Sequence, residues 1–430
     1  MPPYIYGIDF GTTNSTLAIL DTRTNEVIQL FSTPSLLFFP DDQRFSSLIQ
    51  YVVGQEAVQR YVDSRMQGRF MKSIKKVLPN KSFIDTKIGG RSFKAEDLVA
   101  IIISHLKKQA DTFLGQTITT AVIGRPVVFD ENPEKDQLAQ ERLSKAVKIA
   151  GFETFFFQME PIGAAFTYER KINERTLVLV GDFGGGTSDF SLMYLDPSAI
   201  HKADRRSDMI AKGGIYIGGD SFESDMMWHR GTPHFGRGVQ EEFEAGRWLD
   251  LPLSYFHNIC SWEKMNFLDN NRYKESIKRS YVFSGRNEKV KNLQILIENN
   301  LGYLLFREIE RAKVYLTNND STQIKFEEGG INFNETITIS DFEQHIIDKN
   351  LQKIEHYLLT FLENQHIQLS EIQTVFLTGG TSYIRPLQQI FHRLFGSEKI
   401  KSGDNFNSVA IGLAYSYGAY EHLRDPHFSV

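Results

Sequence analysis

Two short stretches of this chain place an aspartate beside glycines and hydroxyl-bearing residues, a combination suited to binding phosphate groups. The first is Asp9-Phe-Gly-Thr-Thr-Asn-Ser15, and the second is Asp182-Phe-Gly-Gly-Gly-Thr-Ser188. Glycines let the backbone approach a ligand closely, so that several N–H groups can point into one concavity that suits a polyphosphate. One aspartate from each stretch could hold a hydrated divalent cation, and magnesium fits such a site because it keeps several of its waters.

Apolar runs flank both stretches and predict how they are held. Residues 4–8 precede the first aspartate and residues 16–20 follow its turn, while residues 176–180 and 190–195 flank the second stretch in the same way. Short apolar or alternating runs separated by glycine-containing turns predict strands joined as hairpins. Because the two copies lie too far apart for a solenoid repeat, we expect two duplicated lobes whose hairpins face each other across a cleft.

A third carboxylate and a basic segment are candidates for the same chemistry. Glu160 follows a short aromatic strand and precedes a helix of small residues, where it would be a base or a metal partner facing the cleft. The alternative is a carboxylate that only favours the start of a helix. Most lysines of segment 69–77 fit a solvated helical face, but one could reach the phosphates as a point charge. Periodicity alone does not choose which.

Further turns and helices complete this organisation. Gly379-Gly380 follows an apolar strand and would let a flat base or ribose lie against the backbone, and residues 213–222 are expected to form another turn that enters a helix. Ser340, with Glu343 three residues later, predicts a capping box at the start of a long helix. The other expected elements are helices at 95–114, 301–316 and 407–420, a strand at 119–126, and a helix that Asn132 and Pro133 open and Gly151 ends, with an apolar stripe of Leu138, Leu143, Ala146 and Ala150.

Length and composition limit the class of protein. The 430 residues exceed what one hydrophobic core usually supports, and 41% hydrophobic with 23% charged residues is typical of a soluble globular protein. A net charge of −5 argues against general nucleic-acid binding. We expect Cys260 to be a small buried residue, and His229 and His234 to be structural, because two histidines five residues apart are weak evidence for a metal. No signal peptide or long apolar run is evident, so the cytoplasm is the expected compartment.

Taken together and in this order, the motifs resemble the nucleotide-binding domain of the DnaK-type heat shock protein 70 family, within the actin/hexokinase-like ATPase superfamily. The resemblance spans nearly the whole chain except residues 226–300, and it is carried by the two phosphate motifs at 7–15 and 181–189, the connecting motif at 160–165, the adenosine motif at 377–382 and Glu310-Arg-Ala-Lys313. It implies an α/β, actin-like ATPase fold. Two duplicated ribonuclease-H-like lobes would each hold a mixed five-stranded sheet flanked by helices, with the nucleotide in the cleft between them.

The resemblance also implies a role for individual residues. Asp9 and Asp182 would hold magnesium through water. The catalytic residues would be Lys72, Glu160, Asp182 and Asp189, with Lys75, one turn away, as the alternative to Lys72. ATP or ADP would be bound by Gly11, Thr12, Thr13, Gly184, Gly185, Gly186, Thr187, Gly218, Gly219, Glu310, Lys313, Val314, Gly379, Gly380, Thr381 and Tyr383. Catalysis would consist mostly of positioning and charge neutralisation.

Two positions depart from the family pattern at the adenine end. Val314 and Tyr383 stand where the family usually has basic residues. An adenine could stack on Tyr383 under apolar cover from Val314, with some loss of cation–π attraction. We therefore expect ATP binding with altered affinity or base selectivity.

The resemblance suggests a domain organisation. Residues 1–175 would form lobe I with a smaller subdomain at 34–99, residues 176–400 would form lobe II with a smaller, divergent subdomain at 218–336, and the C-terminal helix within 401–430 would pack back on lobe I. A full chaperone of this family continues into a peptide-binding domain, whereas this sequence ends at Val430. The expectation is therefore a monomer similar to the short YegD-like putative chaperones, a nucleotide-dependent switch that hydrolyses ATP slowly without its own peptide-binding domain.

Other functions remain open from the residues alone. A sugar-kinase-like phosphotransferase also begins with such a turn, although no distinct substrate-side carboxylate is evident, and a filament-forming actin-like ATPase is a structural alternative. Asp182-Phe-Gly184 does not indicate a protein kinase, because no catalytic-loop motif accompanies it. The expected partners are ATP and a protein partner or co-chaperone, with no nucleic acid and no membrane.

Overall fold

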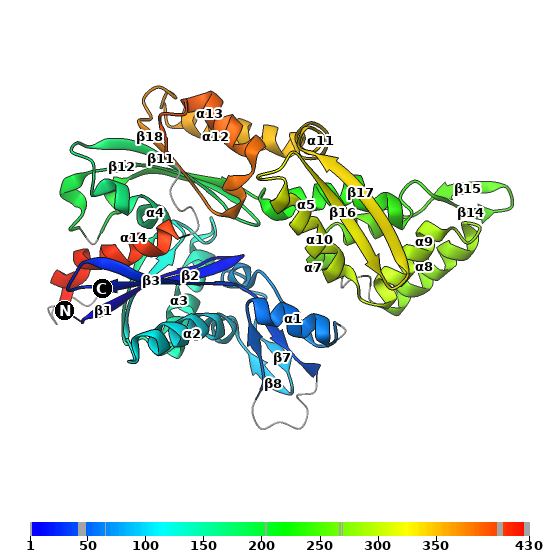
Figure 1. The fold of residues 1–430 in the computed structure, drawn as a ribbon, viewed down its shortest axis with the longest axis horizontal. Helices are drawn as coiled ribbons and strands as arrows, with labels where there is room; N and C mark the ends of the chain where they lie inside the picture. The colour runs from blue at the N-terminus through cyan, green and yellow to red at the C-terminus, as the bar shows by residue number, and fades with distance from the viewer. Residues whose placement is uncertain are drawn as a thin grey trace. The chain divides into compact units, whose positions relative to one another are not determined.

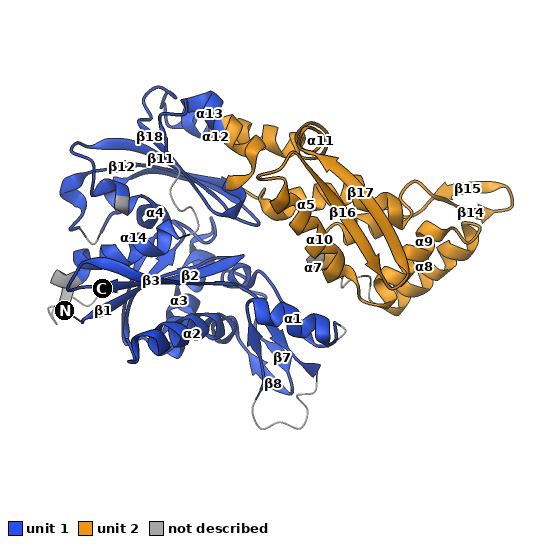
Figure 2. Ribbon diagram, in the orientation of Figure 1, with its two compact units in different colours: residues 1–214, 361–382, 391–430 blue, residues 215–360, 383–390 orange. Residues whose placement is uncertain are grey.

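The computed structural model describes residues 2–41, 49–64, 66–202, 204–265, 268, 270–401 and 407–424. The chain divides into two compact units (Figure 2): unit 1 holds residues 1–214, 361–382 and 391–430, and unit 2 holds residues 215–360 and 383–390. No helix in the described part of the chain is long and apolar enough to cross a membrane.

Unit 1 contains two five-stranded sheets with the same arrangement (Figure 1). The first has the order β10-β9-β1-β2-β3 and the second the order β13-β12-β11-β18-β19. In each sheet an antiparallel hairpin lies at the centre and two parallel strands extend it on one side. The strands are β1 (Tyr4–Phe10), β2 (Asn14–Asp21), β3 (Glu26–Pro34), β9 (Thr120–Arg125), β10 (Thr154–Met159), β11 (Thr176–Phe183), β12 (Ser188–Leu195), β13 (Met209–Ile215), β18 (Thr374–Thr378) and β19 (Ile400–Lys401). The duplication and the two hairpins expected from the sequence are confirmed.

Two helices rich in small residues lie between the sheets (Figure 1). They are α4 (Glu160–Glu169) and α14 (Ser408–Ser416). The two helices cross so closely that a Cβ added to Gly412 would lie 1.9 Å from the carbonyl oxygen of Gly163. Around this crossing, Ile162, Val178 and Leu413 belong to one buried apolar core that joins both sheets. This core fixes the start of α4, and therefore Glu160, relative to the strands on either side.

The outer faces of the sheets are covered by longer helices. The first sheet is covered by α2 (Ala95–Leu114), which packs against α3 (Pro133–Ile149). On the second sheet, Phe183 and Phe190 make ring contacts with Phe391 of α13 (Arg385–Phe395) and Phe361 of α12 (Asp348–Asn364). The smaller elements of unit 1 are β4 (Leu37–Phe39), β5 (Val52–Val53), α1 (Gln55–Asp63), β6 (Arg69–Met71), β7 (Thr86–Ile88) and β8 (Arg91–Phe93), with short helical turns at Ile74–Val77, Pro197–Ala199, Arg206–Asp208, Gly380–Tyr383 and Tyr417–Arg424.

Unit 2 combines helices with two separate β-hairpins. The hairpin strands are β14 (Gln240–Glu244) with β15 (Arg247–Asp250), and β16 (Ser321–Glu328) with β17 (Ile331–Thr338). The helices are α5 (Gly219–Met226), α6 (Leu253–Ile259), α7 (Trp262–Met265), α8 (Asn271–Phe283), α9 (Glu288–Glu298), α10 (Gly302–Tyr315) and α11 (Ile339–Asp341), with turns at Met227–Gly231, Thr232–Phe235 and Phe342–Ile346.

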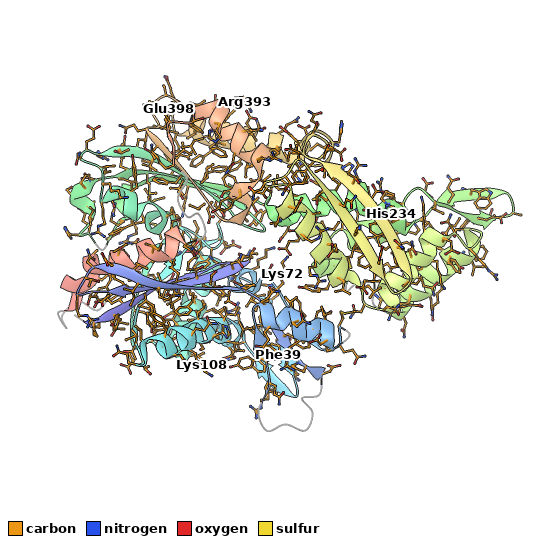
Figure 3. All side chains as sticks on the ribbon, in the orientation of Figure 1. Phe39, Lys72, Lys108, His234, Arg393 and Glu398 are labelled. Carbon is orange, nitrogen blue, oxygen red and sulfur yellow. The ribbon has the colours of Figure 1, made fainter. Side chains whose placement is uncertain are left out.

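The side chain of His234 is held within the packing of unit 2 (Figure 3). Its Nε2 lies 2.7 Å from Glu335 Oε1, and its ring stacks on Phe333 with 4.3 Å between centroids. Among the described residues no group of three or more His, Cys, Asp or Glu side chains is arranged to hold a metal ion. The lone cysteine, Cys260, is buried and free, as expected.

The local predictions had mixed outcomes. The helix at 95–114 is confirmed, and the side chain of Asn132 caps α3 by accepting hydrogen bonds from the amides of Glu134 and Lys135. The capping box at Ser340 is wrong, because Thr338 is the N-cap and its hydroxyl accepts from the Asp341 amide at 3.1 Å. Other differences are small: Leu138 is only half-buried, and Gly213 and Gly214 lie in strand β13 rather than in a turn.

Candidate functional site

The first phosphate motif is the turn between β1 and β2. Asp9 stands opposite Thr16 in the last pairs of the hairpin, so Gly11, Thr12 and Thr13 form the connection. Ser35 braces this turn from the neighbouring segment, because its hydroxyl donates to the Gly11 carbonyl at 2.8 Å and its amide donates to the Thr13 carbonyl at 2.7 Å. The turn requires a glycine, since a Cβ on Gly11 would lie 2.1 Å from the carbonyl oxygen of Asn14.

The second phosphate motif repeats this geometry between β11 and β12. Asp182 stands directly opposite Asp189, and the Gly184 amide closes the turn by donating to the Thr187 carbonyl at 3.0 Å. The hydroxyl of Thr187 donates to Asp189 Oδ2 at 2.7 Å. Gly184, Gly185 and Gly186 have no side chains, so this turn is bare backbone beside the carboxylates of Asp182 and Asp189 and the hydroxyl of Thr187.

An ion pair joins the basic segment that contains Lys75 to Glu160, at the start of α4. Lys75 Nζ lies 2.8 Å from Glu160 Oε1, and the two side chains are only 15% and 11% exposed. Glu160 is the first residue of α4, and Pro161 follows at the first helical turn, where proline fits. Such a pair is well shielded from solvent, so both charges act strongly on their neighbours.

The charges of this cluster shift one another's pKa values. Burial, followed by the charge of Glu160, raises the pKa of Asp9 to about 8, and burial with Glu160 and Asp189 raises the pKa of Asp182 to about 7. Burial also raises the pKa of Asp189. For Lys75, burial alone would lower the pKa, but the surrounding carboxylates together raise it. Four carboxyl groups surround the Lys75 ammonium group here, so a further cation would reduce the repulsion among them.

A third turn supports the second one from behind. The hydroxyl of Thr381 donates to the Gly184 carbonyl at 2.8 Å, and that of Thr378 donates to Asp182 Oδ1 at 3.1 Å. Gly379 adopts φ 78°, and a Cβ there would lie 2.4 Å from the Phe183 carbonyl oxygen. A side chain at this position would therefore push the two turns apart.

Comparison with known proteins identifies the family that carries these turns. A model described as "Hsp70 protein" matches residues 5–229 and 282–422. The chain belongs to the Hsp70 family.

Two curated relatives in this family illustrate the extent of the similarity. The chaperone protein DnaK of Mycoplasmopsis synoviae (strain 53) is 26% identical over 98% of this chain and 59% of its own length. The chaperone protein DnaK of Mycoplasmopsis pulmonis (strain UAB CTIP) is 26% identical over 96% of this chain and 58% of its own length. The chain thus spans somewhat more than half the length of these relatives. Members of the Hsp70 family are ATPases with an actin-like fold, in agreement with the two mixed five-stranded sheets.

Within this Hsp70 chain, Ser73 separates the two lysines between which the sequence left a choice. Ser73 adopts φ 59°, in the left-handed region, just before the short helix Ile74–Val77 that carries Lys75. Lys72 (labelled in Figure 3) lies before this reversal, at the end of the β6 strand. Lys75 is the lysine whose ammonium group contacts Glu160, at 2.8 Å.

Two further residues of the site were missed by sequence reasoning. The ammonium group of Lys76 lies 3.0 Å from the position that a Cβ would take on Gly186, so this lysine covers the second glycine turn. Gly214 of β13 approaches Asp189 closely, since a Cβ there would lie 2.3 Å from Asp189 Oδ1. The sequence signals were only a run of lysines and a Gly-Gly pair, and neither identifies its spatial neighbour.

The predicted adenosine-binding residues of unit 2 lie on two adjoining helices. Gly218 and Gly219 stand at the start of α5, and Glu310, Lys313 and Val314 lie on α10, which packs against α5. An ion pair joins the helices, because Lys313 Nζ contacts Glu223 Oε1 and these side chains are only 12% and 5% exposed. Val314 is 59% exposed. Tyr383 ends the short helix that follows Gly379.

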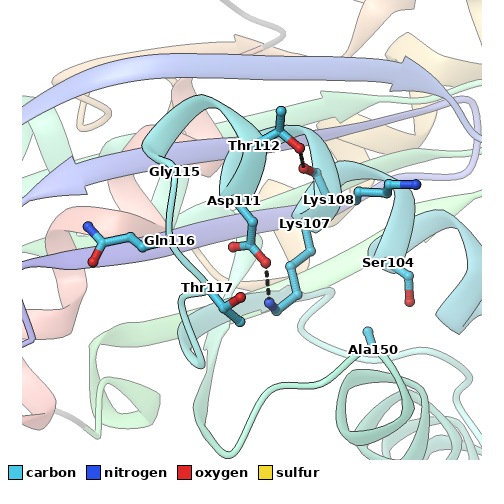
Figure 4. A pocket seen from close by; sticks show the side chains of 9 residues that line it. All are labelled: Ser104, Lys107, Lys108, Asp111, Thr112, Gly115, Gln116, Thr117 and Ala150. Atoms are coloured by element: carbon cyan, nitrogen blue, oxygen red, sulfur yellow. Dashed lines mark hydrogen bonds and ion pairs between the residues drawn. The ribbon is translucent and has the colours of Figure 1, made fainter.

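A cavity of about 610 Å³ lies elsewhere, at the ends of α2 and α3, and does not include these residues (Figure 4). Its Lys107 is already paired with Asp111 at 2.6 Å and lies over the ring of Phe152 at 5.4 Å. The hydroxyl of Tyr6 also donates to Asp111 at 2.8 Å. These groups satisfy one another, so the cavity is a feature of the surface rather than the nucleotide site. It is lined by Ser104, Lys107, Lys108, Asp111, Thr112, Gly115, Gln116, Thr117 and Ala150.

Proposed function

We propose that this chain binds ATP with magnesium and hydrolyses it slowly, and that the bound nucleotide controls its conformation. The observation that carries the proposal is the shielded cluster of Lys75, Glu160, Asp9, Asp182 and Asp189 at the ends of two glycine turns. Perturbed, mutually coupled charges beside phosphate-binding turns are typical of functional sites. The Hsp70 family match supports ATP as the nucleotide.

The two glycine turns would bind the phosphates. Backbone amides at Gly11 and Gly184–Gly186 would donate to the phosphate oxygens, and the hydroxyl groups of Thr12, Thr13 and Thr187 would add further contacts. Ser35 and Thr381 hold the turns in place, since their hydroxyls donate to the carbonyls of Gly11 and Gly184. These hydrogen bonds within the chain pre-organise the turns, which reduces the entropy lost on binding.

The cluster is suited to magnesium held through water by Asp9 and Asp182. Both are carboxylates, the oxygen ligands that magnesium prefers, and a divalent cation would reduce the repulsion among the carboxylates around them. When bound, magnesium would supply neutralisation of the charge on the phosphates.

The remaining groups would position the attacking water and stabilise the transferred phosphoryl group. Lys75 would place a positive charge near the phosphates, and Glu160 holds its ammonium at 2.8 Å. Asp189, fixed by Thr187 and by the close approach of Gly214, would orient the water. Lys76 would add a second cation over Gly186. Because these residues position and neutralise rather than form covalent intermediates, we expect slow turnover.

The adenosine would be bound by the residues predicted for it in unit 2. Glu310 and Lys313 would contact the ribose, and Lys313 would have to exchange its partner Glu223 to do so. Tyr383 and Val314 would cover the base without a cation, so we expect weaker discrimination between ATP and GTP than a basic residue would provide.

We further propose that the protein is a monomer in the cytoplasm and that it acts on a protein partner or co-chaperone.

The test is magnesium-dependent release of phosphate from ATP by the full chain and by Asp182→Asn. The proposal predicts magnesium-dependent turnover in the wild type and a loss of at least about 100-fold in the variant. A surface variant, Glu327→Gln on β16, is the control for preparation and contaminating ATPases. Equal rates in all three proteins, or turnover that is unaffected by chelation, would show that the ATPase assignment is wrong.

A further inference from the structure

The hairpin of β14 and β15 lies in a part of the chain that the family model does not match. The family model matches residues 5–229 and 282–422, so residues 230–281, which contain the whole hairpin, lie outside the match. The hairpin extends beyond α8 and α9 in Figure 1, and β14 lies against α8. On β15 every residue is exposed.

The outer edge of β15 offers backbone groups for pairing. The two strands pair only with each other among the described elements, with Gln240 opposite Asp250 and Glu242 opposite Trp248. The Leu251 amide donates to the Val239 carbonyl at 3.2 Å, so Val239 and Leu251 form a hydrogen-bonded pair. The next pair along the strands, Gln240 and Asp250, is therefore a non-hydrogen-bonded pair. Antiparallel pairs alternate in this respect, so the amide and carbonyl groups of Trp248 and Asp250 point away from β14.

Apolar side chains flank this edge on both faces of the hairpin. Trp248 is 50% exposed and Leu249 is 40% exposed, and as neighbours in a strand they point to opposite faces. Phe243, at the irregular end of β14, is also 50% exposed. Unprotected edges of this kind add a further strand readily, and natural proteins usually avoid leaving apolar residues on them.

The charge of the hairpin indicates what kind of strand would fit. Glu241 and Glu244 lie on β14, opposite Leu249 and Arg247. The other carboxylates make local contacts only, with Glu242 accepting from the Gly246 amide at 3.0 Å and Asp250 from Gln240 at 3.0 Å. The sole basic residue of the hairpin, Arg247, lies over the Phe243 ring. A second copy of the same acidic edge would be repelled, whereas a basic segment would be attracted.

We propose that the β15 edge docks an extended segment of a partner protein that alternates basic and apolar residues, by adding it as a third strand. The outward backbone groups of Trp248 and Asp250 supply the main-chain hydrogen bonds. Trp248 contacts the apolar residues on one face of the added strand, and Glu241 and Glu244, on the Leu249 face of the hairpin, attract the basic residues on the other face. Main-chain pairing provides affinity and the side chains provide selectivity. The proposal is independent of ATP hydrolysis, because the hairpin contains none of the phosphate-binding residues.

The experiment uses the full chain and two fluorescent eight-residue peptides, one alternating lysine and valine and the other alternating glutamate and valine. Anisotropy measures binding, and hydrogen exchange measures protection of individual amides. The lysine peptide is expected to bind and to slow exchange at Trp248 and Asp250. Trp248→Pro removes one outward donor without removing a bond inside the hairpin, and we expect binding to weaken about fivefold.

Two double variants with reversed charges test whether binding depends on this surface or only on general attraction between opposite charges. Glu241→Lys with Glu244→Lys is expected to weaken the lysine peptide about tenfold, while Glu327→Lys with Glu328→Lys on the other hairpin of unit 2 leaves binding unchanged. Hydrogen exchange of β14 without peptide shows whether each variant keeps the hairpin. Equal binding of both peptides, protection at another strand, equal effects of the two charge reversals, or dimers in sedimentation would overturn the proposal.

Discussion

The buried arginine beside the far end of α4 allows a stability prediction with a built-in control. Arg205 donates to both carboxylate oxygens of Glu169, the last residue of α4, at 2.9 and 2.6 Å, and it also contacts Asp208. The side chains of Arg205 and Glu169 are 1% and 0% exposed. The next residue, Arg206, pairs with Asp204 in solvent, with side-chain exposures of 85% and 61%.

The magnitudes follow from these two environments. Arg205→Ala leaves the Glu169 charge buried without its cation, and removing one partner of such a pair lowers the free energy of unfolding by about 3–5 kcal/mol. Arg206→Ala removes a solvent-screened pair, which contributes little to stability. Arg205→Ala should therefore lower the free energy of unfolding far more than the adjacent Arg206→Ala, although each substitution deletes one arginine.

The assay is urea unfolding of the full chain, followed by circular dichroism and by hydrogen exchange of the α4 amides. A double variant, Arg205→Ala with Glu169→Gln, removes the unpaired charge while keeping an acceptor for the Asp196 amide, which now donates to Glu169 at 2.8 Å. We expect the double variant to recover part of the lost stability. Equal losses for Arg205→Ala and Arg206→Ala, or no recovery in the double variant, would refute the reasoning.

The other predictions concern the carboxylate cluster and the buried thiol. Gly214→Ala would place a Cβ 2.3 Å from Asp189 Oδ1, so ATP turnover should fall by up to about 100-fold in a phosphate-release assay, whereas Gly418→Ala, with open space around it, should keep the wild-type rate. The folded-state pKa values of about 8 for Asp9 and about 7 for Asp182 exceed the unfolded value of about 3.9, so the folded, nucleotide-free chain binds more protons between these limits and its stability should decrease as pH rises from about 4 to 8. Urea unfolding across this range should show a shallower decrease for Asp182→Asn, and an identical slope would contradict the shift. Burial raises the pKa of Cys260 to about 12, so a thiol reagent at pH 8 should label it slowly in the native chain and rapidly in urea, and fast native labelling would count against its burial.

The parts of the fold that the sequence predicts well depend on local patterns. The two hairpins at Asp9 and Asp182 follow from apolar runs on either side of a glycine turn, and the duplication follows from their repetition. The helix at 95–114 and the Asn132 cap likewise depend on neighbouring residues alone. The capping box predicted at Ser340 is wrong for the same reason. Thr338 is an equally good N-cap two residues earlier, and the helix begins there.

The site itself required distances that no local pattern contains. The left-handed Ser73 reverses the chain between Lys72 and Lys75, so periodicity could not show which lysine reaches Glu160. The approach of Gly214 to Asp189, and of Lys76 to Gly186, joins segments far apart in the chain. The family resemblance supplied the order of the motifs, but only the structure shows that Lys75 contacts Glu160.

The most direct measurement of the central claim is single-turnover ATP hydrolysis with saturating enzyme and magnesium in Lys75→Ala, with Lys72→Ala as the matched control. Because Lys75 is the ammonium group held at 2.8 Å by Glu160 within the carboxylate cluster, we predict that its removal slows the chemical step by about 100- to 1,000-fold while Lys72→Ala keeps most of the wild-type rate. A large loss in Lys72→Ala with a near wild-type rate in Lys75→Ala would contradict the account.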